Sequence, residues 1–208
     1  MSGEGGGLGE GISARLEEAA AVLRRGGIVV YPTETFYAVG ARADDGEALA
    51  RLLRAKLRPA GKPLPLLAAD RTQVARLAVL EGAAALVASR LWPGPLTLVL
   101  PALASADPAL TAGTGTVGIR IPGSAVAREL AARAGCALVS TSANPSGGAP
   151  PRAVAELAPA LLAQVDGVLD AGRTPGGAPS TVVRVEGLVV TVLRQGAVPI
   201  AEVVAALG

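Results

Sequence analysis

The sequence predicts an α/β protein with a single domain, in which an open, twisted, mixed sheet is flanked by helices. Short apolar, β-branched runs alternate with helical patterns over most of the chain. The length of 208 residues suits one domain, which we expect to cover 13–208 after a flexible, glycine-rich tail at 1–12. Near the C-terminus, the apolar runs 181–185 and 188–193 predict a hairpin, and a hairpin makes the sheet mixed rather than purely parallel.

The N-terminal region is predicted to hold a helix, a strand and a second helix. Ser13 is a candidate N-cap for a helix that runs to Arg24. The apolar run 28–31 predicts a buried strand, and the Pro-Thr-Glu-Thr loop then lies at the carboxyl end of that strand. Asp44, with a glutamate three residues later, predicts the start of a helix that continues to about Lys56. Ligands bind beyond the carboxyl ends of strands in such sheets, so the loop is a candidate binding element.

The same signals predict the remaining elements. Strands are expected at 64–69, 96–100, 117–121, 137–141 and 167–170. Helices are expected at 71–77, at 83–91, from Ser124 to about Gly135, at a segment before 167 that is interrupted near Pro159, and at 199–207.

The composition excludes several kinds of catalytic site. The chain has no histidine and one cysteine, Cys136, which excludes Ser-His-Asp and Cys-His arrangements, zinc sites built from Cys and His, and an internal disulfide. Catalysis must then rest on positioning, on charge stabilisation by cations and backbone N–H groups, or on a carboxylate-bound metal. Phosphate chemistry can proceed by these means alone.

The apolar segments and the N-terminus indicate a cytoplasmic protein without a membrane partner. Gly, Pro or a charged residue interrupts every apolar stretch before the roughly 18 residues that a membrane-spanning helix needs. The acidic N-terminus lacks the basic start and apolar middle of a secretory signal. The net charge of +2 is too small for a nonspecific nucleic-acid binder.

One basic segment stands out because of its lysines. Only two of the 19 cationic residues are lysines, Lys56 and Lys62, and they lie on either side of Arg58. The compact charge of lysine and the planar fork of arginine both suit phosphate oxygens. The alternative is a solvated helix face, which is what most runs of charge are. The two lysines favour phosphate binding, and we expect this segment to face the loop 140–147.

That loop is a second cluster of scarce residues. Residues 140–148 contain the only asparagine, Asn144, together with hydroxyls and glycines whose N–H groups can bind phosphate or carboxylate, although the pattern alone is more typical of an ordinary polar turn. Arg120 lies in a β-branched strand, where a cation needs an anionic ligand or a buried carboxylate partner. Asp166 and Asp170 are either metal ligands or caps at strand ends.

Six motifs follow one another in this order along almost the whole chain: PTETFYAVG, KLRPAGKPL, LWPGPLTLVL, TVGIRIP, STSANPSG and PSTVV. Together they resemble the YrdC/TsaC family of threonylcarbamoyl-AMP synthases, from about Leu16 to Gly196, in its short form without an additional C-terminal domain. The resemblance implies a deep basic cavity and the formation of threonylcarbamoyl-AMP and pyrophosphate from L-threonine, bicarbonate or CO2, and ATP. It also implies Mg2+ as cofactor, transfer of the product to a tRNA threonylcarbamoyl transferase complex that modifies tRNA beside the anticodon, and possible contact with RNA.

The matching motif positions carry the family's functional residues to this chain. The resemblance implies a catalytic set of Lys56, Arg58, Ser142 and Asn144. It implies an ATP-binding set of Arg58, Lys62, Thr116, Ser142 and Arg194. It implies a threonine-binding set of Thr35, Arg120, Ser140 and Ser180, in which Arg120 would pair with the carboxylate of the amino acid. The metal ligands are not identified.

The sequence departs from the family pattern in three places. YAVG replaces YGLG, Leu67 replaces a frequent histidine, and Pro150 replaces a frequent serine. These departures bear on activity more than on fold, so the alternative function is a catalytically weakened module that binds double-stranded RNA or tRNA. The related carbamoyl-adenylate chemistry of hydrogenase maturation proteins is less favoured, because their zinc-finger and acylphosphatase segments are absent from this sequence.

Overall fold

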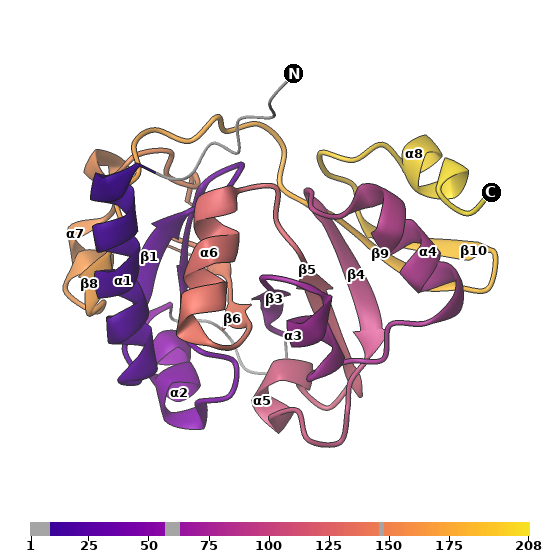
Figure 1. The fold of residues 1–208 in the computed structure, drawn as a ribbon, viewed down its shortest axis with the longest axis horizontal. Coiled ribbons are helices and arrows are strands. Elements are labelled where there is room, and N and C mark those ends of the chain that lie inside the picture. Colours follow the sequence, from indigo (N-terminus) through magenta and orange to yellow (C-terminus); the bar gives the residue numbers. More distant parts are fainter. Residues whose placement is uncertain (1–8, 57–62, 146–147) are drawn as a thin grey trace.

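The computed structural model describes residues 9–56, 63–145 and 148–208, whose helices and strands are drawn in Figure 1. The helices are α1 (Glu10–Arg24), α2 (Gly46–Ala55), α3 (Arg71–Ala75), α4 (Gly82–Leu91), α5 (Pro108–Thr111), α6 (Ala125–Ala134), the 3-10 helix η1 (Val154–Glu156), α7 (Pro159–Leu162) and α8 (Ile200–Ala205). The strands are β1 (Val29–Pro32), β2 (Tyr37–Gly40), β3 (Pro65–Leu67), β4 (Leu96–Pro101), β5 (Thr116–Arg120), β6 (Leu138–Val139), β7 (Thr141–Ser142), β8 (Gly167–Val168), β9 (Thr181–Glu186) and β10 (Val189–Arg194). None of the described helices is both long and apolar enough to cross a membrane.

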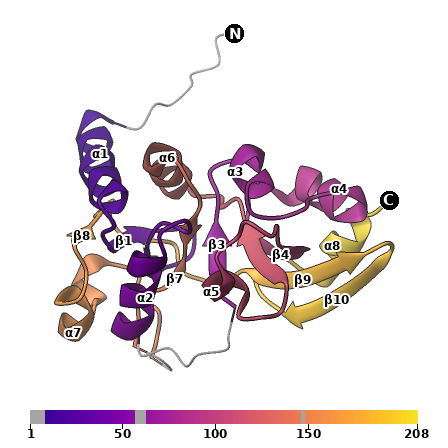
Figure 2. The ribbon, with the colours of Figure 1, turned by 90° about the horizontal axis from the view of Figure 1, so that it is seen from below.

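The strands form two hydrogen-bonded sheets. One sheet has four strands in the order β7-β2-β1-β8, and the other has six in the order β10-β9-β4-β5-β3-β6. The pairs β1–β8, β3–β5 and β4–β9 are parallel and the other pairs are antiparallel, so the predicted mixed α/β fold is confirmed. The strands divide between two sheets, however, where one continuous sheet was expected. Figure 2 shows α1, α6, α3 and α4 in a row over one face of both sheets.

The two sheets meet where β6 passes into β7. A single residue, Ser140, separates the edge strand of the six-stranded sheet from the edge strand of the four-stranded sheet. The N–H of Ser140 donates to the carbonyl oxygen of Pro65 in β3 (2.8 Å). The N–H of Val139 donates to the carbonyl oxygen of Ala41, just after β2 (2.9 Å). The backbones approach so closely here that a Cβ atom on Gly40 would overlap the carbonyl oxygen of Val139. The polar segment that begins at Ser140 is therefore held between the sheets.

Two apolar cores hold the strands in place. Helices α1 and α6 pack together over β1 and contribute fully buried leucines, among them Leu16, Leu23 and Leu130. The larger core joins strands of both sheets to α2, α3 and α4, and Leu66 and Leu98 are among its buried residues. Each such leucine contributes roughly 1.5–3 kcal/mol through the transfer of apolar surface out of water. The cores thus fix the strands β1, β3 and β5, whose ends carry the polar groups described below.

Helix α1 starts earlier than predicted. It begins at Glu10 with Gly9 at the N-cap position, so Ser13, the expected cap, lies inside the helix. The Ser13 hydroxyl instead accepts a hydrogen bond from Arg133 of α6 (3.1 Å). Glu10 in the first turn interacts favourably with the positive end of the helix dipole. Residues 10–12 of the predicted tail therefore belong to the folded domain.

The other two predicted caps differ in outcome. Helix α2 is capped by Asp45, whose carboxylate accepts a hydrogen bond from a first-turn N–H (2.9 Å), and the prediction of Asp44 was wrong by one residue. Asp44 is instead bound by two nitrogens of Arg42 (2.9 and 2.7 Å). The cap at Ser124 is confirmed, because its hydroxyl accepts a first-turn N–H of α6 (3.2 Å).

Several short elements were not predicted. Strand β2 has four residues that are all buried, so it shows no alternation, and α5 is equally short. The strand expected at 137–141 is divided into β6 and β7, and the helix expected before 167 consists of η1 and α7. The C-terminal hairpin β9–β10 and the closing helix α8 are confirmed.

Candidate active site

A cavity of about 640 Å³ lies where the two sheets meet, a volume that suits small-molecule ligands. Its wall is formed by Thr33, Thr35, Phe36, Tyr37, Ala38, Pro65, Leu66, Thr97, Arg120, Ser140, Thr141, Ser142, Asn144, Pro150, Gly177, Pro179, Ser180 and Arg194. Among these described residues, the charged side chains are Arg120 and Arg194, and none is a carboxylate. The basic cavity expected from the sequence is therefore present.

The loop after β1 presents Thr35 to the cavity. The Thr33 hydroxyl donates to the carbonyl oxygen of Phe36 (2.8 Å) and accepts from the N–H groups of Thr35 and Phe36 (3.3 Å each). This local closure makes the loop a tight turn. The carbonyl oxygen of Thr35 accepts the N–H of Gly176 (2.8 Å), which ties the loop to the segment opposite. The Thr35 side chain is thus fixed in a largely buried position in the cavity wall.

Ser180 and Arg194 form the wall that belongs to the six-stranded sheet. Arg194, the last residue of β10, donates to the carbonyl oxygen of Ser180 (3.0 and 2.8 Å) and to its hydroxyl (2.9 Å). The Ser180 hydroxyl also lies 3.0 Å from that of Thr97 in β4. Burial, reinforced by repulsion from Arg120, lowers the pKa of Arg194 from its ordinary value. The guanidinium group of Arg194 therefore favours an anionic ligand at this wall of the cavity.

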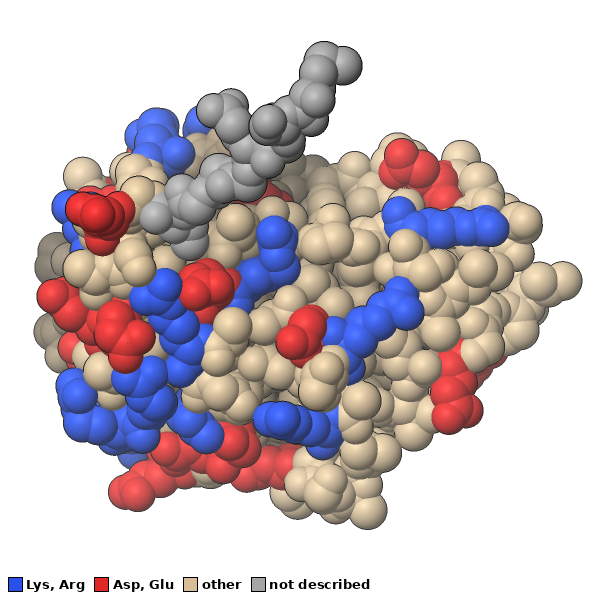
Figure 3. All heavy atoms as spheres, viewed as in Figure 1, with Lys and Arg blue, Asp and Glu red and all other residues tan. Residues whose placement is uncertain are grey.

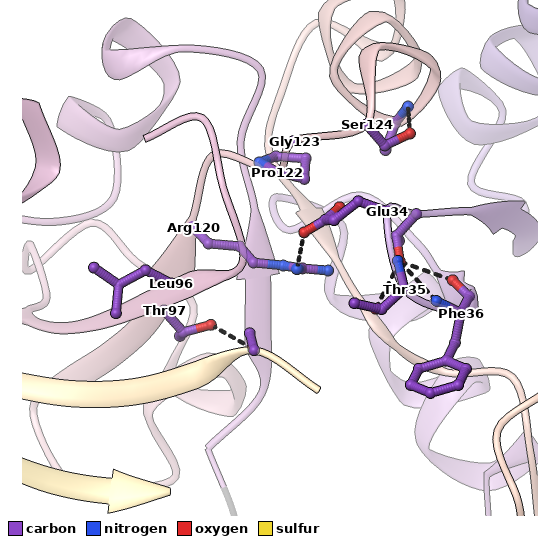
Figure 4. A network of polar contacts seen from close by, with 12 residues as sticks. Glu34, Thr35, Phe36, Leu96, Thr97, Arg120, Pro122, Gly123 and Ser124 are labelled. Atoms are coloured by element: carbon purple, nitrogen blue, oxygen red, sulfur yellow. Dashed lines mark hydrogen bonds and ion pairs between the residues drawn. The ribbon is translucent and has the colours of Figure 1, made fainter. Parts of the chain in front are cut away.

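Arg120, at the end of β5, already has a carboxylate partner. Its Nη1 donates to Oε1 of Glu34 at 2.5 Å, and the side chains are 11% and 18% exposed, respectively. Figure 4 shows Glu34 reaching from the loop after β1 toward the guanidinium, with Thr35 and Phe36 on the same loop. The sequence left open whether a buried carboxylate or an anionic ligand would pair with Arg120. The structure shows the carboxylate, and it also places Arg120 in the cavity wall.

Lys56 connects helix α2 to the loop that follows β7. It is the C-cap residue of α2, and its Nζ donates to the carbonyl oxygens of Ser142 (2.6 Å) and Asn144. The amide of Asn144 in turn donates to the carbonyl oxygen of Gly148, which closes the loop. The expected contact between the basic segment and the 140–147 loop is therefore present at Lys56.

Most of the candidate residues converge on the cavity. Seven of them form part of its wall: Thr35, Arg120, Ser140, Ser142, Asn144, Ser180 and Arg194. Thr116 does not, because it starts β5 whereas Arg120 ends it, and four residues of strand span roughly 13 Å. Its hydroxyl lies 3.0 Å from that of Thr114. Arg58 and Lys62 lie outside the described residues.

Two of the positions that depart from the family pattern occupy different surroundings. Pro150 lies in the cavity wall, so the replacement of a serine there removes a hydroxyl from the binding surface. Leu67 is fully buried in the core formed by α1 and α6 and is not part of the wall. The replacement at Pro150 thus alters the cavity directly, and the replacement at Leu67 alters the packing behind β3.

Asp166 and Asp170 have structural partners. Asp166 accepts the N–H of Ile28 (2.8 Å) and binds Arg51 through both oxygens (3.0 and 2.9 Å). Asp170 accepts the hydroxyl of Tyr37 (3.1 Å) as well as a backbone N–H two residues on. These contacts favour the strand-end interpretation over metal binding. Within the described ranges, no group of three or more His, Cys, Asp or Glu side chains could hold a metal ion.

Two residues of the site were not identified from the sequence. Thr97 lies inside an apolar strand, where one threonine gives no signal of function. Glu34 belongs to the quoted PTETFYAVG motif, and a carboxylate in an otherwise polar, uncharged turn could have been proposed as the partner of Arg120.

The family of this protein is shown by comparison with known sequences, and the mixed α/β fold and the cavity agree with it. The family model for Sua5, YciO and YrdC proteins, described as "Telomere recombination", matches residues 21–196. The chain therefore belongs to this family.

Individual relatives carry a more specific name. A threonylcarbamoyl-AMP synthase of Halorhodospira halophila is 42% identical over 78% of this chain and 85% of its own length. One of Pyrococcus abyssi is 35% identical over 95% of this chain, and the match spans only 60% of that relative. The structure of P. abyssi Sua5 in complex with L-threonine is similar with a TM-score of 0.87 at 35% identity, covering 93% of this chain and 57% of that one.

Proposed function

We propose that the chain is a threonylcarbamoyl-AMP synthase that uses L-threonine, bicarbonate or CO2, and ATP. The observation that carries the proposal is that one cavity brings together the two candidate groups. Thr35, Arg120, Ser140 and Ser180 form one group, and Ser142, Asn144 and Arg194 form the other. The family relatives named threonylcarbamoyl-AMP synthase and the threonine complex of P. abyssi Sua5 support the same assignment.

The threonine group would bind and orient the amino acid. A free N–H edge of the Arg120 guanidinium can receive the carboxylate, since Arg120 uses only Nη1 within the described structure. The hydroxyls of Thr35, Ser140 and Ser180 can hold the polar groups of the substrate. The amino nitrogen then attacks the carbon of CO2 or bicarbonate and loses its proton, which yields an N-carboxylate, and the bicarbonate route also releases water.

The nucleotide group would direct the second step. A carbamate oxygen attacks the α-phosphorus of ATP while the bond to the bridging oxygen of the β-phosphate breaks, and pyrophosphate leaves. Lys56 holds the carbonyl oxygens of Ser142 and Asn144, so the loop beside the phosphates is fixed before the reaction. Arg194 adds positive charge from the opposite wall.

We propose that Mg2+ enters the cavity with ATP. The wall offers hydroxyl, amide and carbonyl oxygens but no carboxylate among its described residues, so it suits a cation held mainly by phosphates and water. Bound in this way, the ion would neutralise charge on the departing pyrophosphate.

The product would pass to a tRNA threonylcarbamoyl transferase complex in the cytoplasm. The face drawn in Figure 3 intersperses cationic and anionic side chains, so its described residues form no uniformly basic surface for nucleic acid. We propose that the accepting complex, rather than this face, makes the main contact with tRNA.

The test is a turnover assay with purified, folded protein. ATP, L-threonine and 13C-bicarbonate should yield pyrophosphate and a labelled threonyl adduct of AMP detected by mass spectrometry, and omission of threonine should abolish both. Absence of threonine-dependent turnover would refute the proposal. Strong, salt-sensitive RNA binding without ATP binding would then favour the weakened RNA-binding module.

A further inference from the structure

Glu34 lies behind Arg120 rather than in the cavity. Arg120 is part of the cavity wall and Glu34 is not. The stem of Glu34 passes beside Gly123, where a Cβ atom would lie 3.7 Å from the Glu34 Cβ and Cγ atoms. Figure 4 shows this side of the pair, with Pro122 and Gly123 next to Glu34 and the guanidinium beyond it. Glu34 therefore acts on a ligand through Arg120 and not by direct contact.

The carboxylate of Glu34 is committed to Arg120. One oxygen accepts the Nη1 hydrogen bond at 2.5 Å, and the other is buried without a hydrogen-bond partner in the described structure. Because no other donor among the described residues reaches the Glu34 carboxylate, the Arg120 guanidinium is the main group that compensates its buried negative charge. The pair therefore stays together unless another group supplies the missing donor.

The two guanidinium groups of the cavity differ in their partners. Arg120 is paired with a carboxylate, whereas Arg194 is hydrogen-bonded to the uncharged oxygens of Ser180. The negative charge of Glu34 offsets that of Arg120, so the Arg120 end of the cavity carries little net charge. The positive charge of Arg194 is not offset by a carboxylate in this way among the described residues.

This difference discriminates between kinds of anion. A phosphate group bears up to two negative charges and no positive one, so Glu34 repels it about twice as strongly as it repels a carboxylate at the same distance. An α-amino acid bears one carboxylate and one ammonium, and the ammonium is attracted to Glu34. The end that holds the Glu34–Arg120 pair is therefore suited to a zwitterion and unsuited to phosphate.

We propose that Glu34 is a specificity-determining residue that keeps phosphate groups away from Arg120 and reserves this end of the cavity for the amino acid. The phosphates of ATP are thereby directed away from the Glu34–Arg120 pair. The identity of the two ligands rests on the proposed function, but the exclusion of phosphate by Glu34 does not.

The test compares phosphate binding and its competition with threonine. Glu34→Gln keeps the shape of the side chain and removes its charge. By calorimetry, about 10 mM inorganic phosphate should change the threonine Kd of the native protein by less than about twofold, and should raise that of Glu34→Gln about tenfold. Phosphate alone should bind Glu34→Gln more tightly than the native protein, and this gain should vanish in Glu34→Gln/Arg120→Gln.

Two further variants separate the proposed role from a structural one. Glu129→Gln removes the same charge from a surface ion pair with Arg133 and should leave phosphate binding unchanged. Glu34→Asp keeps the charge but shortens the side chain, so its phosphate affinity should lie between that of the native protein and that of Glu34→Gln. A folded Glu34→Gln protein with native phosphate affinity would overturn the inference. If Glu34→Gln does not fold, Glu34→Asp decides. The shorter side chain neutralises the guanidinium of Arg120 less completely, so this variant should bind phosphate at least about threefold more tightly than the native protein. Equal affinity would overturn the inference.

The outcomes for the two proposals are distinct. If the native protein does not bind threonine, the proposed function fails, while the direct phosphate titration still tests Glu34. If threonine binds and turns over but phosphate binding is unaffected by Glu34→Gln, only the inference about Glu34 fails.

Discussion

Nζ of Lys56 lies 2.6 Å from the carbonyl oxygen of Ser142, so the C-terminal end of α2 holds the loop that forms one wall of the cavity. A lysine that binds two carbonyl oxygens of one loop restrains the backbone as well as supplying charge. This relationship joins the four-stranded sheet, to which β7 belongs, to the C-terminal end of α2.

Lys56→Ala is expected to lower kcat about 100-fold, because the loop loses its anchor and the reacting groups lose their alignment. Arg58→Ala, at the adjacent motif position, is expected to be similarly deficient. Both proteins should melt within a few degrees of the native one, as measured by circular dichroism. Arg54→Ala is the matched control, since Arg54 is an exposed cation on the same helix. Full activity of Lys56→Ala and Arg58→Ala would show the site to be wrongly assigned.

Arg120→Gln is expected to raise KM for L-threonine about 100-fold, since a charged hydrogen bond to the substrate carboxylate is lost. The affinity for ATP should change little, because we propose that its phosphates are kept away from Arg120. Steady-state kinetics with each substrate varied in turn, together with ATP titration calorimetry, checks this. An equal loss of affinity for both ligands would contradict the division of the cavity.

Gly40→Ala is expected to lower the free energy of unfolding by about 3 kcal/mol, because the added methyl group forces β2 away from the carbonyl oxygen of Val139. Urea unfolding measures the change. Gly11→Ala is the control: its Cβ has open space in α1, so the change should stabilise the protein by up to about 1 kcal/mol. Equal stability of the two variants would contradict the close approach of the sheets.

Stability is expected to fall between pH 10 and 12, in part because of Tyr31. Burial raises the pKa of Tyr31 to about 12 from its ordinary value of 10.0, against smaller opposing effects of Ser140 and Arg120. The folded protein keeps this proton while the unfolded chain releases it, so the stabilisation is complete below pH 10 and is lost as the pH rises to 12. A shift of this size corresponds to about 2–3 kcal/mol.

Tyr31→Phe isolates this contribution. The variant should lose less stability than the native protein between pH 10 and pH 12, as urea unfolding at each pH would show. At pH 7 it should cost little, since the buried Tyr31 hydroxyl forms no hydrogen bond of good geometry within the described residues. Parallel pH profiles for the two proteins would rule out a contribution from Tyr31.

Local signals predicted the order and type of most elements. They failed at the exact start of two helices and at one fully buried strand. Asp44 and Asp45 can both cap a helix, and the choice of Asp45 depends on Arg42, which binds Asp44. Ser13 had the right chemistry for a cap, but Gly9 and Glu10 start the helix one turn earlier. Strand β2 escaped notice because complete burial removes the alternation that identifies a strand.

The composition of the site was easier to predict than its geometry. Rare residues and motif order identified Lys56, Arg120 and Asn144, because their chemistry is costly or unusual in those positions. The pairing of Arg120 with Glu34 depends on how β1 and β5, from two different sheets, are placed relative to each other. The PTETFYAVG motif offered Glu34 as a candidate carboxylate, but no local pattern shows which cation it meets, and for the same reason Thr97 could not be identified.

Ser140 belongs to neither sheet, yet it joins the edge strand of one directly to the edge strand of the other. Neither half of the molecule can form the cavity alone, so a partly folded chain with one sheet in place has no binding site. A ligand that binds only the complete fold stabilises it by mass action. Substrate occupancy should therefore make the two halves unfold as a single cooperative unit and protect from proteolysis segments that lie far from the cavity.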